Sequence, residues 1–432
     1  MHRVLDAATT FATNFFSVNL SLWPLRYAEK SLTRDWDFVF RMVDPHSELS
    51  QSSNRKLVLA GQVAFFPTGI LQTMLGPMLP ILIVRWAMND TQAGNLFLVQ
   101  FLASLLGVQL AGVLLARLGF RPAFLSGLLL MAGGVATLYL GSPILGLASV
   151  AAYGLGLGLI VPADNLLIAE IGSGTDRSSK ASAVSLLNFF WGVGAVFCSL
   201  MVAWTAAHKL LPIFLGSVAL LLVLLALAMR DLPFPAAAKA AEPSASSSWR
   251  EIVRSPAIWI FAAIFFLYPG AETAVGGWIG SYVLRLGAHG VEMASVMPAF
   301  FYAALTVGRG LGTAFLRYFP ERRVLQAGYA AGAAGIGLML LTSALPAVIG
   351  GALITGLSFA TLYPITVARF SQRFGVAARS IGAVMFSLAS VGPAVIPWMV
   401  GVISHATGSL RAGLLLPFAA TVILFLLHLF EW

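Results

Sequence analysis

The sequence predicts an all-α membrane protein, in which twelve transmembrane helices form two pseudo-symmetric six-helix bundles. Of the 432 residues, 59% are hydrophobic and 10% are charged, whereas a soluble domain has roughly 25% charged residues. Apolar runs of about 20 residues, enough to cross a hydrocarbon core ~30 Å thick, recur along the chain, and its two halves repeat. Because the runs are continuously apolar and do not alternate, helices rather than a β-barrel satisfy the backbone in lipid.

Four segments are expected along the chain. Residues 1–54 form an N-terminal tail, amphipathic or poorly ordered, because charges run through it and it lacks the cleavage site of a signal peptide. Residues 55–229 form the N-terminal six-helix bundle, 230–255 an Ala-, Ser- and Pro-rich cytoplasmic linker, and 256–432 the C-terminal six-helix bundle. The spans are expected at 57–86, 92–116, 122–141, 145–171, 180–205, 209–229, 256–285, 292–316, 323–342, 345–370, 379–404 and 410–430.

The two halves repeat at an offset of about 200 residues. The stretch "GVLLARLGFRPAFLSG" from Gly112 aligns with "GTAFLRYFPERRVLQAG" from Gly312, and "SAVSLLNFFWGVGAV" aligns with "GAVMFSLASVGPAVI". With a small insertion, "FFPTGILQTMLG" aligns with "FFLYPGAETAVGG". Parallel repeats of six helices are how alternating-access carriers are built, with the substrate held near the bilayer midplane between the halves.

The basic residues predict the orientation. If both termini are cytoplasmic, the cytoplasmic loops and the end of the tail hold 16 of the 26 Lys and Arg residues, and the opposite loops hold 4. This bias is typical of the cytoplasmic side of a membrane. The bias also explains the net charge of +9, so no nucleic-acid partner is needed to account for it. We therefore expect a multi-pass protein of a bacterial inner membrane, with the lipid bilayer as its partner.

The sequence lacks the residues that metal, cofactor or ATP-driven chemistry would require. Cys198 is the single cysteine, and the six histidines are scattered, so the sequence predicts neither a metal site nor a cofactor. No phosphate loop with a lysine is present, which argues against ATP-driven pumping. The run "GLGLG" at 154–158 follows no strand, so close helix packing is expected there. A monomeric carrier of a small molecule, and not an enzyme, fits these observations.

The stretch "YPGAETAVGGW" holds a carboxyl near the middle of the seventh span. A charged group at this depth costs at least ~2.5–3.5 kcal/mol, so it is expected to face a wet cavity or a partner. Burial disfavours the charged form of Glu272, which suits proton coupling or substrate binding; a structural acid in a bent helix is the alternative. The glycines around it make bending plausible, and Trp278 shares a face with Glu272 only if the helix breaks.

Two further charged residues lie at similar depths in opposite halves. By helical rise, Asp164 is ~9 Å and Arg309 ~7 Å cytoplasmic of their span midpoints. One hypothesis is that they pair across the halves and close a cytoplasmic gate. The alternatives for Asp164 are direct binding of substrate or proton and a purely structural role. Glu170, at the end of its span, is expected to be a solvated cap.

Polar and aromatic residues within the spans are candidates to line the substrate cavity. Amide groups hydrogen-bond to hydroxyl groups, and flat aromatic rings stack on a sugar. Each is equally explained as core packing. The candidates are Thr68, Gln72, Thr73, Asn165, Asn188, Trp191, Tyr268, Trp278 and Tyr363.

Five segments carry a resemblance to the major facilitator superfamily. The loop "GVLLARLGFR" resembles its signature after the second span, with Ala116 where an acid is usual, and it makes Arg117 and Arg121 gating candidates beside Arg309. "YPGAETAVGGW" resembles a motif of the fucose–proton symporter-like family, which includes glucose/galactose carriers. "VGRGLGT", "TLYPITVARF" and "GPAVIPWMVGVIS" resemble its eighth, tenth and eleventh spans. The first span departs from that family, since it offers Gln72 and Thr73 where sugar symporters carry an acid.

Together the residues and the resemblance predict a secondary active transporter with protons as the coupling ion. The expected substrate is a small polar solute such as a monosaccharide. An exporter or flippase of amphipathic compounds is the alternative, favoured by the apolar first span. A receptor or sensor on a carrier fold is a third reading.

Overall fold

The computed structural model describes residues 45–171, 177–235, 254–287, 290–375 and 378–430. By its contacts the chain divides between Arg55 and Lys56. Most of the expected N-terminal tail and linker, and the Glu170 side chain, lie outside the described residues. Every membrane span described here belongs to the unit 56–432.

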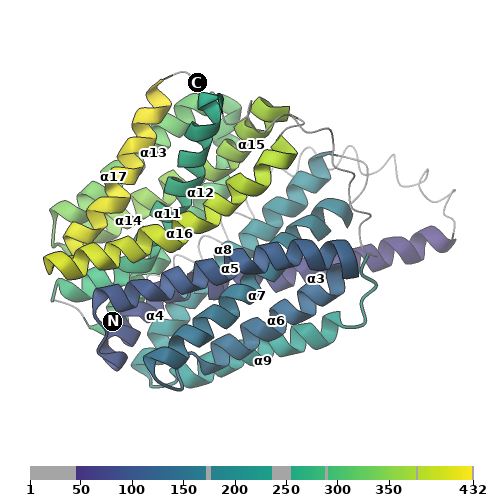
Figure 1. Cartoon of the computed structure of the whole chain (residues 1–432), viewed down its shortest axis with the longest axis horizontal. Helices are drawn as coiled ribbons and strands as arrows, with labels where there is room; N and C mark the ends of the chain where they lie inside the picture. The colour runs from purple at the N-terminus through teal and green to yellow at the C-terminus, as the bar shows by residue number, and fades with distance from the viewer. Residues whose placement is uncertain (1–44, 172–176, 236–253, 288–289, 376–377, 431–432) are drawn as a thin grey trace, which may run out of the picture. The chain divides into compact units, whose positions relative to one another are not determined.

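The described elements are all helices (Figure 1). Twelve of the described helical segments are long and apolar enough to cross a membrane, which confirms the predicted fold class. The first half contains α3 (Pro45–Thr73), α4 (Leu75–Trp86), α5 (Asp90–Leu118), α6 (Phe120–Thr137), α7 (Pro143–Ile171), α8 (Arg177–Ala207) and α9 (Leu211–Met229). The second half contains α11 (Pro256–Arg285), α12 (Val291–Tyr318), α13 (Glu321–Leu341), α14 (Leu345–Phe359), α15 (Leu362–Phe374), α16 (Ala378–Thr407) and α17 (Leu410–Leu429).

The first and tenth spans are each made of two helices. Helices α3 and α4 meet at Met74, and α14 and α15 are separated by Ala360 and Thr361. The seventh span is a single helix, α11, which continues without a break past Glu272 and contains Pro269. Its glycines serve packing: a side chain at Gly276 would meet the ring of Tyr302.

Small residues also bring helices together inside the first half. Helix α7 packs against both α5 and α6. A side chain at Gly154 would run into the backbone of Gln100, and one at Gly158 into the backbone of Ser104, both on α5. The expectation of close packing at "GLGLG" is confirmed.

The two halves meet through a few helix pairs. Helix α5 packs along α16, and α8 packs along α12 (Figure 1). Helix α4 contacts both α11 and α12. These contacts hold together the residues of the candidate site.

Candidate functional site

Glu272 lies at the centre of a polar cluster. Tyr268, one helical turn earlier on α11, donates from its hydroxyl to Oε2 of Glu272 at 2.6 Å. Oε1 of Glu272 is 3.9 Å from Nη2 of Arg309 on α12, an ion-pair distance longer than a hydrogen bond. The two side chains are 17% and 24% exposed, so the pair is largely but not completely removed from solvent.

Arg309 extends the cluster to the other half of the molecule. Its guanidinium carbon lies 4.8 Å from the ring centre of Trp191 on α8, in a cation–π contact. The indole Nε1 of Trp191 in turn donates to Oε1 of Gln72 on α3 at 3.0 Å. Gln72, Trp191, Arg309, Glu272 and Tyr268 therefore form one connected chain of predicted residues across both halves.

An aromatic wall fixes the Tyr268 ring. The ring of Tyr363 on α15 lies 6.2 Å away and nearly parallel, and the ring of Tyr329 on α13 meets it edge-on at 6.4 Å. The Tyr268 hydroxyl is also 2.7 Å from the carbonyl oxygen of Phe359, the last residue of α14. Tyr268 thus connects the carboxyl to the break in the tenth span.

The hypothesis that Asp164 pairs with Arg309 finds no such contact in this structure. Asp164 is fully buried against Gly61 of α3, and its oxygens have no hydrogen-bond partner among the described residues. Helical rise gives the depth of a residue but not the direction it faces, and Asp164 faces its own half. Since an isolated ionised carboxylate is strongly disfavoured there, Asp164 stays a candidate for holding a proton.

Three of the other candidates are hydrogen-bonded to their own helix. Thr68 and Thr73 donate to backbone carbonyls of α3, at 2.6 and 2.8 Å. Asn165 donates to the carbonyl of Val161 at 2.8 Å, and Asn188 is partly buried on α8. These hydrogen bonds satisfy polar groups within the span, as is common for such side chains in a helix.

Trp278 belongs to the contact between the halves and not to the polar cluster. Its ring is fully buried, its Nε1 donates to the carbonyl of Pro397 on α16 at 2.9 Å, and the ring centre of Phe97 on α5 is 6.1 Å away. Because α11 does not break, Trp278 points away from Glu272, as six residues of helix dictate.

A second charged site joins the halves near the end of α11, and sequence reasoning missed it. Asp90, at the first position of α5, is 4% exposed and accepts two hydrogen bonds from Arg285 and one from Ser404 of α16. Arg285 Nη1 lies 2.7 Å from Asp90 Oδ2. One turn deeper, Trp398 of α16 donates to Asn95 of α5 at 3.0 Å. Nothing in the sequence singles out Asp90 or Arg285, since each lies at the end of a span.

Besides the packing of α8 along α12 and the Arg309–Trp191 contact, one group of contacts between the halves lies at one end of the spans. These contacts involve the second half of the first span, the start of α5, the end of α11 and the end of α16. This is the end that carries the turn 87–89, which the loop charges predict to be external. At the opposite end of α5, Arg117 is exposed, and Arg121 donates to the carbonyl of Leu232, just after α9, at 3.0 Å.

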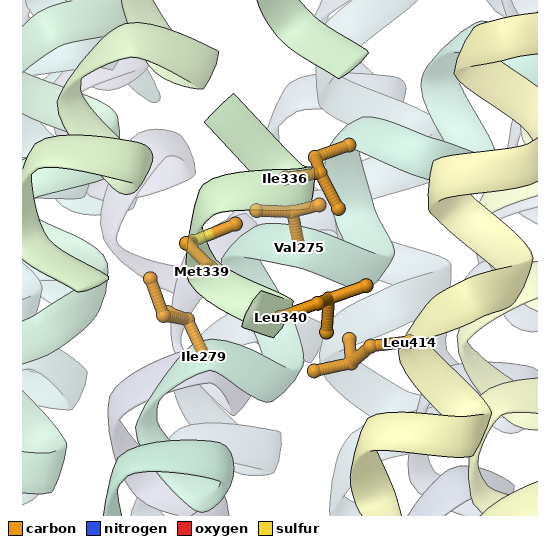
Figure 2. Close-up of a pocket in the computed structure, with 6 residues that line it drawn as sticks. All are labelled: Val275, Ile279, Ile336, Met339, Leu340 and Leu414. Carbon is orange, nitrogen blue, oxygen red and sulfur yellow. The ribbon is translucent and has the colours of Figure 1, made fainter. Parts of the chain in front are cut away.

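An apolar pocket lies elsewhere, inside the second half. Figure 2 shows six aliphatic or methionine side chains around it, from α11, α13 and α17. With no polar side chain in its lining, it offers nothing to orient a polar solute. The lining residues are Val275, Ile279, Ile336, Met339, Leu340 and Leu414.

Comparison with known families gives one match over most of the chain. The profile of the Major Facilitator Superfamily matches residues 63–397. Among curated relatives, a yeast protein named "Bypass of stop codon protein 6" is 26% identical over 313 residues, 63% of this chain and 60% of its own length. A "Glucose/galactose transporter" of Brucella abortus is 24% identical over 389 residues, 84% of this chain and 91% of its own.

Solved structures share the fold at low identity. A nucleoside transporter superposes with a TM-score of 0.69 at 14% identity, covering 86% of this chain and 99% of that one. The fucose:proton symporter of E. coli superposes with a TM-score of 0.61 at 17% identity, covering 87% and 98%. At such identities the likeness concerns the fold alone.

Proposed function

Because the chain belongs to the major facilitator superfamily, a family of membrane transporters, we propose that it moves a small polar solute together with protons. In this proposal residues 55–229 and 256–432 rock against each other around the central cluster, joined by the linker 230–255. Glu272 is the coupling carboxyl. The protein works as a monomer in a bacterial inner membrane, with both termini in the cytoplasm.

The position of Glu272 is the observation that supports proton coupling. Its carboxyl has a neutral partner on one oxygen, the Tyr268 hydroxyl, and a cationic one near the other, Arg309. A hydroxyl serves both forms of the acid, because it donates to a carboxylate and accepts from a carboxylic acid. Such a carboxyl can bind and release a proton without losing its partners.

A neutral solute such as a monosaccharide suits the groups near Glu272. The amide of Gln72 and the pair of Glu272 with Arg309 can hydrogen-bond hydroxyl groups, and the rings of Trp191 and Tyr363 offer flat apolar faces. The glucose/galactose transporter among the relatives and the fucose:proton symporter among the structures support this class. The nucleoside transporter indicates that other polar solutes also fit this fold.

Export of amphipathic compounds is the second candidate. The first span contains no acidic residue, and the hydroxyls of Thr68 and Thr73 are bonded to their own helix. The first span itself therefore offers no carboxyl that would bind a proton. A carrier-fold receptor is the third reading, and it predicts binding without transport.

The test is transport into proteoliposomes by Glu272→Gln, with labelled glucose, galactose and fucose and with a fluorescent lipid as probes. We expect this variant to lose proton-driven accumulation of a sugar but to keep exchange of that sugar. Glu292→Gln, at the start of α12, is the matched control and is expected to accumulate normally. Full accumulation by Glu272→Gln would refute proton coupling through Glu272, and transport of the lipid alone would favour the second candidate.

A further inference from the structure

The hydroxyl of Tyr268 faces two oxygen atoms with one hydrogen. It lies 2.6 Å from Oε2 of Glu272 and 2.7 Å from the carbonyl oxygen of Phe359. A backbone carbonyl only accepts hydrogen bonds, and a phenol has a single hydrogen to donate. The proton on Glu272 therefore decides which way this hydrogen points.

Two arrangements are possible. If Glu272 carries a proton, it donates to the Tyr268 oxygen, and Tyr268 donates to the carbonyl of Phe359, so each oxygen contact contains one hydrogen. If Glu272 is ionised, its carboxylate attracts the Tyr268 hydrogen, because bonds to a charged acceptor are the stronger ones. The carbonyl of Phe359 then faces a phenol oxygen without a hydrogen between them, which is unfavourable at 2.7 Å.

The carbonyl in question lies at a break in the fold. Phe359 is the last residue of α14, and α15 begins at Leu362. The last carbonyls of a helix have no partner within it and need one from outside. A bond from Tyr268 to Phe359 thus fastens the break in the tenth span to α11, and its loss leaves that break less constrained.

The Tyr268 ring itself is held in place. It is 3% exposed and packed between the rings of Tyr363, Tyr329 and Phe359. Rotation of the hydroxyl hydrogen needs no movement of the ring. The geometry therefore supports a switch in the direction of a hydrogen bond and not a swing of the side chain.

Other ionisable groups surround the pair. From α12, Arg309 is 3.9 Å from Glu272, and Tyr302 interacts electrostatically with it. Tyr363 of α15 faces both Glu272 and Tyr268, whereas Tyr329 of α13 lies beyond Tyr268. Behind Tyr329, the ring of His428 on α17 is 4.9 Å away. Arg309 is the cation nearest the carboxyl among the described residues.

We propose that Tyr268 transmits the protonation state of Glu272 to the break between α14 and α15. With Glu272 protonated, Tyr268 donates to Phe359 and the tenth span is fastened to α11. After release of the proton, Tyr268 donates to Glu272 and the break is freed. The proposal rests on the proposed function, since it requires that Glu272 exchange a proton during transport.

The test measures the break directly and needs no substrate. In a Cys198→Ala background, spin labels at Leu353 on α14 and Gln372 on α15, both exposed, report the distance across the break as a function of pH. We expect a distance that changes with pH in the parent and stays constant in Tyr268→Phe. Tyr282→Phe is the matched control, because Tyr282 also donates from α11 to a backbone carbonyl, that of Met339 at 3.0 Å, and should behave as the parent.

The outcomes separate this proposal from the proposed function. If Glu272→Gln loses proton-driven accumulation and Tyr268→Phe keeps the pH-dependent distance, the role of Tyr268 is overturned and the coupling carboxyl stands. If Glu272→Gln accumulates sugar normally, the proposed function fails first. Should Tyr268→Phe fold poorly, Glu272→Gln still decides: its amide mimics the protonated acid, so a distance that continues to change with pH in that variant overturns the switch.

Discussion

Arg285 at the end of α11 holds Asp90 at the start of α5, and this pair joins the two halves of the transporter. Asp90 is 4% exposed, so its carboxylate depends on Arg285 and Ser404 for its hydrogen bonds. The Asp90 carboxylate also lies at the N-terminus of α5, where the helix dipole favours an acid. In an alternating-access carrier, a contact at this end has to open when the site is exposed to that side.

Asp90→Asn should weaken the closed arrangement. The side chain of Arg285 is 39% exposed, which lowers the contribution of the pair through solvent screening, so we expect a loss of about 1 kcal/mol. A change of this size shifts a two-state population several-fold. Spin labels at the exposed positions Val84 and Ala406 measure the distance across this end, and we expect a larger share of long distances.

The control for this prediction is an exchange of the two charges. Asp90→Arg combined with Arg285→Asp should bring the distance distribution back towards the parent, whereas each single reversal should open this end further. If Asp90→Asn leaves the distribution unchanged, the pair does not stabilise the closed end.

Trp191→Phe should weaken substrate binding with little effect on the fold. The substitution keeps an aromatic face for Arg309 but removes the Nε1 donor that bonds Gln72 at 3.0 Å. This hydrogen bond holds the Gln72 amide in the orientation in which it would bind substrate. A neutral hydrogen bond contributes about 1 kcal/mol, and if this amount is lost from substrate binding, the half-saturation constant for exchange should rise roughly fivefold. Trp204→Phe on the same helix is the control, because Trp204 is 42% exposed and away from the cluster. Equal effects of the two substitutions would contradict a role for Trp191 in the site.

Much of this architecture could be predicted from the sequence, because span length and hydropathy are local properties. The twelve spans follow from apolar runs. The break in the tenth span was not predicted, since "TLYPITVARF" is compatible with a continuous helix up to Tyr363. A helix break depends on what the surrounding helices offer the carbonyls it exposes. The Tyr268 hydroxyl, from a span almost a hundred residues away, is such a group.

The site was harder to predict for the same reason. Glu272 stood out as a carboxyl inside an apolar span, and Arg309 as a cation inside another. Their proximity depends on which way each helix faces after packing, and a single sequence does not encode that plainly. Asp90 and Arg285 went unnoticed because residues at span ends are ordinarily solvated, whereas here the halves close over them.

Gly76→Ala should disturb the closed end of the carrier. A methyl group there would lie 2.6 Å from the backbone carbonyl of Gly276 across the interface between the halves, too close for α4 and α11 to keep their spacing. We expect both a lower melting temperature and longer distances between labels at Val84 and Ala406. Gly112→Ala is the control, since nothing lies within 4 Å of the added methyl group, and in a helix it should stabilise by about 0.5–1 kcal/mol. A Gly76→Ala protein that matches the Gly112→Ala protein would contradict this packing.

A double-mutant cycle should find Arg309 coupled to Glu272 and not to Asp164. Residues in contact have non-additive effects, whereas distant residues act independently. Arg309 lies 3.9 Å from Glu272, while Asp164 is buried against α3 with no hydrogen-bond partner among the described residues. We therefore expect Glu272→Gln to restore part of the sugar exchange that Arg309→Gln alone loses, because removing both charges leaves none unpaired. Asp164→Asn with Arg309→Gln should show the sum of the single effects. Non-additivity in the second cycle would indicate that the two residues pair in another state of the transport cycle, and additivity in the first would remove the ion pair from the mechanism.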